Sequence, residues 1–158
     1  MFATREPQAL PAEMHWPAPL TESYLAVPVF YNKQQSSLYV GFVQGVHHNF
    51  LYTVEQMLRC DTRPCILPPA VFQENAEKAP GSGDSETIVI QQRQSAIEMT
   101  RTVANYAAQV HAERCGMTWC DDHLWIRLGC PTSFHVDFLF RLPAPSRVSR
   151  ENFLQRAN

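Results

Sequence analysis

The stretch that decides the fold is HLWIRLGCPTSFHVDFLFRL, residues 123–142. Apolar residues alternate along both halves and a Gly-Cys-Pro break lies between them, which is typical of a β-hairpin. Arg127 would then face His135, and Trp125 would face Asp137, on the polar side of the hairpin. A slip of one residue would mix the two faces. We therefore expect a five-residue loop and three apolar pairs on the other face: Leu128–Phe134, Ile126–Val136 and Leu124–Phe138.

Signals for a helix start and a helix stop predict a helix before the hairpin. Ser95 and Glu98 have the spacing of a capping box, in which each side chain accepts a hydrogen bond from the other residue's amide. A stripe of apolar residues at helical spacing follows, and Gly116 can supply a left-handed stop. These signals predict a helix over residues 96–115.

Residues 36–59 allow two interpretations. The first is a strand followed by a helix from about Asn49 to Cys60. The second is one long helix, because apolar residues also recur there at helical spacing. Gly41 and Gly45 would each cost that helix about 1 kcal/mol relative to alanine. We favour the strand followed by the helix.

Two further apolar runs, residues 22–31 and 86–90, are rich in strand formers. The resulting order, β-β-α-β-α-β-β, predicts a two-layer α+β domain over residues 23–142. Its antiparallel or mixed sheet would have about five strands, with two helices on one face and a flexible loop at residues 61–85. This loop would contain one helical turn near residues 70–78. Prolines in residues 1–22 and after residue 142 predict extended Pro-rich arms, the second (143–158) with a short helix.

Charge and composition exclude some partners. The 158 residues carry a formal net charge of −2, so neither nucleic acid nor an anionic membrane surface is an expected partner. No apolar run reaches the length of a transmembrane helix.

Residues 111–130 contain two histidines and three cysteines. In the expected helix, His111 and Cys115 share one face, and Cys120 and His123 follow after the turn at Gly116. Structural zinc is usually bound by four thiolate or imidazole ligands, which these residues could supply. Cys130 lies a whole strand away, roughly 20 Å. The zinc hypothesis therefore uses His111, Cys115, Cys120 and His123, and no other cofactor is expected.

The cysteines have two other interpretations. Cys60 could pair with Cys65, and Cys115 with Cys120, in a periplasmic or secreted protein. Free cysteines buried as small apolar residues would fit a cytoplasmic protein. We favour this last interpretation.

An enzyme built on His135 and Asp137 is a further hypothesis, because a His–Asp pair can orient a general base. The sequence places no nucleophile beside them. A solvated strand face with an Arg127–Asp137 ion pair is the favoured interpretation.

The segment 39–69 contains Gly41-x3-Gly45 and Cys65-x2-Pro68. These features resemble a family of small periplasmic immunity proteins against type VI secretion effectors. The resemblance implies a periplasmic binding protein with a small helical fold, in which the hairpin of residues 123–142 has no counterpart.

The arms give the leading function hypothesis. Trp16 and Leu20 in the first arm, and Phe153 and Leu154 in the second, are large apolar residues in segments that suit docking into a partner's groove. No catalytic constellation is complete. The sequence therefore predicts a non-enzymatic protein–protein interaction subunit or adaptor, which contacts other protein chains of a larger assembly through its arms.

Overall fold

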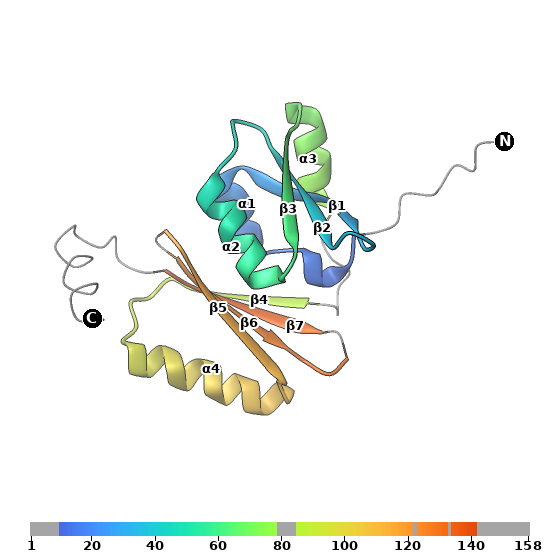
Figure 1. Ribbon diagram of the computed structural model, residues 1–158. Helices are drawn as coiled ribbons and strands as arrows, with labels where there is room; N and C mark the ends of the chain where they lie inside the picture. The colour runs from blue at the N-terminus through green and yellow to red at the C-terminus, as the bar shows by residue number, and fades with distance from the viewer. Residues whose placement is uncertain (1–9, 79–84, 122, 133, 142–158) are drawn as a thin grey trace, which may run out of the picture. The chain divides into compact units, whose positions relative to one another are not determined.

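The computed structural model describes residues 10–78, 85–121, 123–132 and 134–141 (Figure 1). The chain divides into two compact units, residues 1–85 and 86–158. The first contains a three-stranded sheet and the second a four-stranded sheet, each with helices. The α+β class is therefore confirmed. In place of one sheet within residues 23–142, however, the structure has two sheets.

The first unit is a mixed sheet with helices around it. Its sheet has the order β1-β2-β3, with β1 and β2 antiparallel and β2 and β3 parallel. Helix α2 provides the crossover that a parallel pair requires. The elements in chain order are η1 (Ala12–Met14), α1 (Ala18–Tyr24), β1 (Ala26–Asn32), β2 (Ser37–Phe42), α2 (His48–Leu58), β3 (Asp61–Ile66) and α3 (Pro69–Glu77).

The strand-then-helix interpretation of residues 36–59 is confirmed, and the long helix is wrong. Strand β2 ends at Phe42, and α2 begins at His48. The helix starts where the His47 side chain accepts a hydrogen bond from the Phe50 amide at 3.3 Å. It ends at Arg59, which is left-handed with φ 52°. Local caps thus separate the two elements.

Prolines begin helices in two stretches, one expected to be an extended arm and the other a loop with one helical turn near residues 70–78. In the N-terminal stretch, α1 follows Pro17 and has a proline in its first turn. In residues 61–85, α3 follows Pro68 and begins at Pro69. Proline is favourable there because its fixed φ suits the first turn and its missing N–H is not needed. The rest of the expected loop contains β3, in which Pro64 is tolerated because β3 is an edge strand.

The second unit is a four-stranded sheet with one long helix. Strand β7 lies between β4 and β6 in the order β4-β7-β6-β5, and β5, β6 and β7 are antiparallel neighbours. Figure 1 shows α4 along one face of this sheet. The elements are β4 (Ser85–Ile90), α4 (Ala96–Val110), β5 (Arg114–Cys120), β6 (His123–Gly129) and β7 (His135–Arg141).

Helix α4 begins as expected and ends five residues early. The capping box of Ser95 and Glu98 is present. His111, left-handed with φ 54°, ends the helix, and strand β5 begins at Arg114. Gly116 is therefore a strand residue, and the expected end at residue 115 is wrong.

The hairpin and its two faces are confirmed, but its expected register is wrong by two residues. The observed apolar pairs are Leu124–Phe140, Ile126–Phe138 and Leu128–Val136. A slip of two keeps every side chain on its own face, so alternation cannot detect it. In the observed register Arg127 lies directly opposite Asp137, and pairing these opposite charges favours it over the expected one.

Candidate functional site

The face of the second sheet toward α4 forms an apolar core. Six buried residues of β6 and β7 make its centre: Leu124, Ile126, Leu128, Val136, Phe138 and Phe140. The inner side of α4, including Met99, Val103 and Tyr106, packs against them. No residue of α4 is fully buried, however. One helix therefore covers this face only in part.

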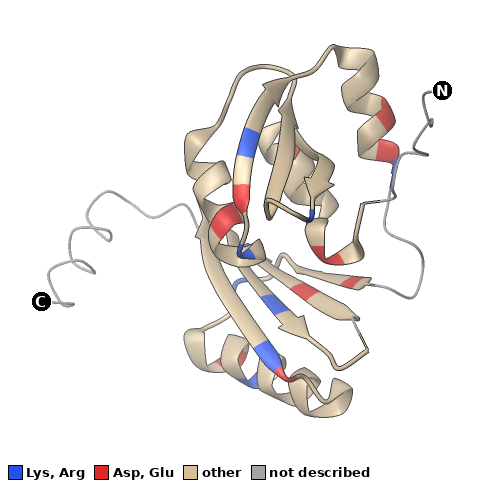
Figure 2. Cartoon of the chain, turned by 45° about the vertical axis from the view of Figure 1, so that its right-hand side comes forward, with Lys and Arg blue, Asp and Glu red and all other residues tan. Residues whose placement is uncertain are grey.

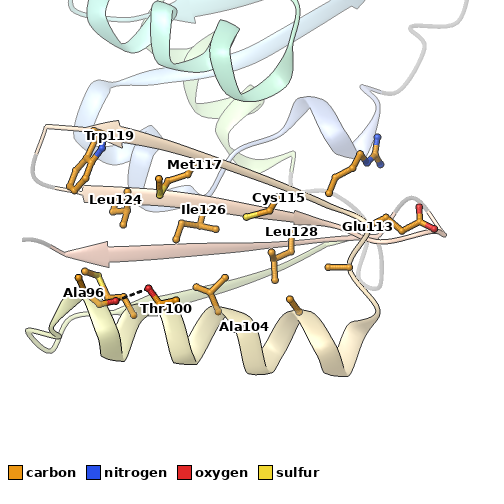
Figure 3. Close-up of a pocket in the computed structure, with 15 residues that line it drawn as sticks. Ala96, Thr100, Ala104, Glu113, Cys115, Met117, Trp119, Leu124, Ile126 and Leu128 are labelled. Carbon is orange, nitrogen blue, oxygen red and sulfur yellow. Dashed lines mark hydrogen bonds between the residues drawn. The ribbon is translucent and has the colours of Figure 1, made fainter. Parts of the chain in front are cut away.

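An apolar groove of about 540 Å³ remains between α4 and strands β5 and β6 (Figure 3). Its helix wall is made of small residues such as Ala96, Thr100 and Ala104. Its floor and far wall include Cys115, Met117 and Trp119 of β5 and the core leucines and isoleucine of β6. Small side chains on α4 leave space that larger ones would fill.

Strand β5 exposes large apolar side chains into this groove. Met117 and Trp119 lie two residues apart, so both point to the same face of the strand. They are 64% and 56% exposed. Figure 3 shows them on the groove side, with Trp119 at one end and Glu113 at the other. Contiguous apolar exposure of this kind usually marks an interaction site.

The groove has few polar groups with which to orient a small molecule. The Thr100 hydroxyl donates a hydrogen bond to the Ala96 carbonyl at 2.7 Å. Glu113 and Arg114 lie at the end of the groove opposite Trp119. Ligand sites usually combine an apolar lining with several convergent polar groups, and in this groove the polar groups are confined to one wall and one end.

The opposite face of the sheet carries the expected polar residues, and they are buried. Asp137 accepts hydrogen bonds from Arg127 Nε at 2.7 Å, Arg127 Nη2 at 2.9 Å and Trp125 Nε1 at 2.9 Å. The Arg127 guanidinium also lies 5.3 Å from the centre of the Trp125 ring. The expected Arg127–Asp137 ion pair is therefore present, but Arg127 is only 9% exposed and Asp137 2%. The face is not solvated.

The pKa of Asp137 reflects this environment. Burial by itself raises it, while hydrogen bonds from His135, Arg127 and Trp125 and the Arg127 charge hold it below its ordinary value. His135 Nε2 is 3.5 Å from Oδ2, which is long for a hydrogen bond. Arg127 is therefore the stronger partner. The carboxylate stays ionised because a fixed cation faces it.

This geometry gives little support to an enzyme built on His135 and Asp137. His135 is 5% exposed, and its Nδ1 has no hydrogen-bond partner among the described residues. Asp137 is fully engaged by Arg127 and Trp125. A general base must reach the proton that it removes, and this pair is enclosed. The cluster is best explained as a buried ion pair that helps to fix the register of β6 and β7.

The structure does not bring the four residues of the zinc hypothesis together. Cys115 and Cys120 lie on β5, roughly 17 Å apart at the rise of a strand and on opposite faces. His123 pairs with Cys120 at one end, while His111 precedes the other end of β5. The described residues contain no group of three or more ligands placed to hold a metal ion. The hypothesis depended on a helix through residue 115, where the structure has a strand.

The five cysteines are free thiols. The strand spacing of Cys115 and Cys120 exceeds the reach of a disulfide, and so does that of Cys65 on β3 and Cys60, which directly precedes β3. Burial and nearby Asp121 raise the pKa of Cys120 to about 12. Burial, Glu55 and Asp61 raise that of Cys60 to about 11. These two thiols are therefore protonated and unreactive at neutral pH.

The residues expected to dock through the N-terminal arm pack inside the first unit. Trp16 makes an edge-to-face contact with Phe50 at 5.3 Å, and its Nε1 donates to the Thr21 hydroxyl at 3.0 Å. Leu20 is fully buried. Phe153 and Leu154 lie outside the described residues. The surface of β5 beside the groove was missed, although Cys115, Met117 and Trp119 alternate with Arg114, Gly116 and Thr118 as in a half-buried strand.

Comparison with protein-family models, curated proteins and solved structures gives no match. The similarity of residues 39–69 to the immunity proteins thus stays a resemblance of short motifs. In the structure, Gly41 lies on β2 and Cys65 on the neighbouring β3. Among the described residues, no helix has the length and apolar character needed to span a membrane. Figure 2 shows acidic and basic residues interspersed along the described ribbon.

Proposed function

We propose that this chain is a non-enzymatic protein–protein interaction subunit that binds an extended apolar segment of another protein chain along β5. The observation that carries the proposal is an edge strand with an apolar side. Among the described residues, strand β5 has a neighbour in its sheet on one side only. Met117 and Trp119 project from it beside the groove.

An added strand would find two kinds of contact there. Backbone N–H and C=O groups along the outer edge of β5 can form a ladder of hydrogen bonds with the added segment, and the groove can receive alternate side chains of that segment. The groove is mainly apolar, so the partner segment should carry apolar residues at every second position. This surface takes the place of the N-terminal arm as the docking site, because Trp16 and Leu20 are enclosed.

A small-molecule site is the competing interpretation of the groove, since its volume lies within the range of ligand pockets. The lining favours a protein segment instead. Its polar groups lie on one wall and at one end, while the exposed backbone of β5 supplies regularly spaced donors and acceptors. Regular spacing suits a strand better than a compact ligand.

The test is selection of displayed random peptides on the full chain, followed by binding measurements on the peptides that are enriched. We expect apolar residues at alternate positions, and at least about tenfold weaker binding to M117E, because a charge would enter an apolar contact. Tyr52→Glu is the matched control, since Tyr52 is 63% exposed on α2. Peptides that bind M117E as well as the unaltered chain would reject the proposal.

A further inference from the structure

We infer that the strand added to β5 comes from a second copy of this chain, so that two copies pair edge to edge about a two-fold axis at Met117. This inference rests on the proposed function, because it names the partner of the same surface. It follows from the open edge of β5, the order of its side chains and the apolar area that it exposes.

The edge of β5 lacks the usual features that prevent pairing. Its pairing with β6 runs without a bulge from Arg114–Gly129 to Cys120–His123. The strand contains no proline, and its only charged residue is Arg114 at its start. Edge strands of proteins that stay single are commonly short, bulged, or interrupted by lysine or proline. Strand β5 therefore carries none of these interruptions between Arg114 and Cys120.

The order of side chains suits antiparallel pairing with an identical strand. With Met117 opposite itself, Cys115 of each copy faces Trp119 of the other. A small residue then lies opposite a large one at two symmetric positions, all on the groove side. A register shifted by two residues would place Cys115 opposite Asp121, or Trp119 opposite Glu113. The centred register is the one that pairs all three of Cys115, Met117 and Trp119 with one another.

The exposed apolar side chains supply part of the area that a dimer needs. Met117, Trp119 and Ile97 are 64%, 56% and 68% exposed. Ile97 shares a helix face with Thr100 and Ala104, which line the groove. At roughly 200 Å² for a large side chain, the three expose about 380 Å² per copy, or about 750 Å² for two. A standard interface buries about 1,200–2,000 Å², and the paired backbones and groove walls would supply the remainder.

Sedimentation velocity over a range of concentrations tests the inference on the full chain. We expect a dimer of twice the 18.0 kDa chain mass. M117E and M117K should each weaken dimerisation at least about a hundredfold, because each places like charges opposite one another at the axis. An equal mixture of the two variants should restore the dimer, since a glutamate then faces a lysine. Tyr52→Glu should leave dimerisation unchanged.

The mixture distinguishes a loss of pairing from a loss of folding. If both variants merely misfolded, mixing them would not restore a dimer, and circular dichroism of each variant would show the loss of structure. A dimer that persists in M117E, or a mixture that stays monomeric although both variants are folded, would overturn the inference.

Other occupants of the groove give distinct results. A full chain that is monomeric at every concentration, yet binds selected peptides in a Met117-dependent way, would overturn the inference and leave the proposed function intact. A chain ending at Arg141 that dimerises while the full chain does not would assign the groove to residues 142–158, and would also overturn it. A full chain that is monomeric and binds no selected peptide would reject both the dimer inference and the proposed function.

Discussion

Replacing Asp137 with alanine should destabilise the second unit by about 4 kcal/mol. The carboxylate accepts two hydrogen bonds from Arg127 and one from Trp125, at 2.7–2.9 Å. Both members of the ion pair are buried, so water cannot replace the lost partner. Removing one member of a buried pair leaves an uncompensated charge, which typically costs about 3–5 kcal/mol. That loss corresponds to roughly a thousandfold change in the folding equilibrium.

A double-mutant cycle isolates the interaction. Asp137→Leu and Arg127→Met should each be strongly destabilising, whereas the double variant should regain most of the stability, because no buried charge is left unpaired. The assay is equilibrium urea unfolding followed by circular dichroism. If the alanine variant lost less than about 1 kcal/mol, or if the two single effects simply added, the pair would behave as a solvated one and the reasoning would be refuted.

The same pair should make stability depend on acid. The pKa of Asp137 lies below its ordinary value of 3.8 in the folded state. Its contribution is therefore complete above the unfolded-state pKa and is lost as pH falls below that value through the folded-state pKa. Asp137→Asn should flatten this part of the stability profile. An unchanged profile below pH 3.8 in the variant would contradict the assignment.

Three smaller predictions test other parts of the fold. Ser95→Ala removes the N-cap hydrogen bond of α4 and should cost about 1 kcal/mol in urea unfolding, whereas no change would mean that the helix end frays. Gly41→Ala should lower the melting temperature, because the added methyl group overlaps the Leu67 side chain; an unchanged melting temperature would show that Leu67 moves aside freely. In dilute protein at neutral pH, iodoacetamide should modify exposed Cys115 well before buried Cys120, as peptide mass mapping would report; equal rates would contradict the burial of Cys120.

Strong local signals predicted the elements that they border. The capping box of Ser95 and Glu98 located the start of α4, and the alternation of residues 123–142 gave the hairpin and its faces. These signals depend on neighbours in the sequence. The same logic separated β2 from α2, because glycines disfavour a continuous helix there.

What was missed depends on contacts between distant residues. The two-residue slip of the hairpin is decided by the buried pairing of Arg127 with Asp137, which alternation does not detect. The sequence predicts a helix through residue 115 because Gly116 can supply a left-handed stop, whereas in the structure His111 adopts that conformation and ends α4. That error also produced the zinc hypothesis and hid the exposed side of Met117 and Trp119. The enclosure of Trp16 depends on Phe50, which lies far along the chain.

The strand order of the second unit also governs when it can form during synthesis. Of the strands in the described residues, β7 is the last of this sheet in the sequence, yet it lies between β4 and β6. Until residues 135–141 leave the ribosome, β4 has no partner strand. The apolar core on β6 also lacks the residues that β7 contributes, Val136, Phe138 and Phe140. The first unit has no such dependence, because β1, β2 and β3 follow one another in the chain and in the sheet. Since long-range strand pairing is slow, nascent chains should acquire protease resistance in residues 10–78 well before the second unit does.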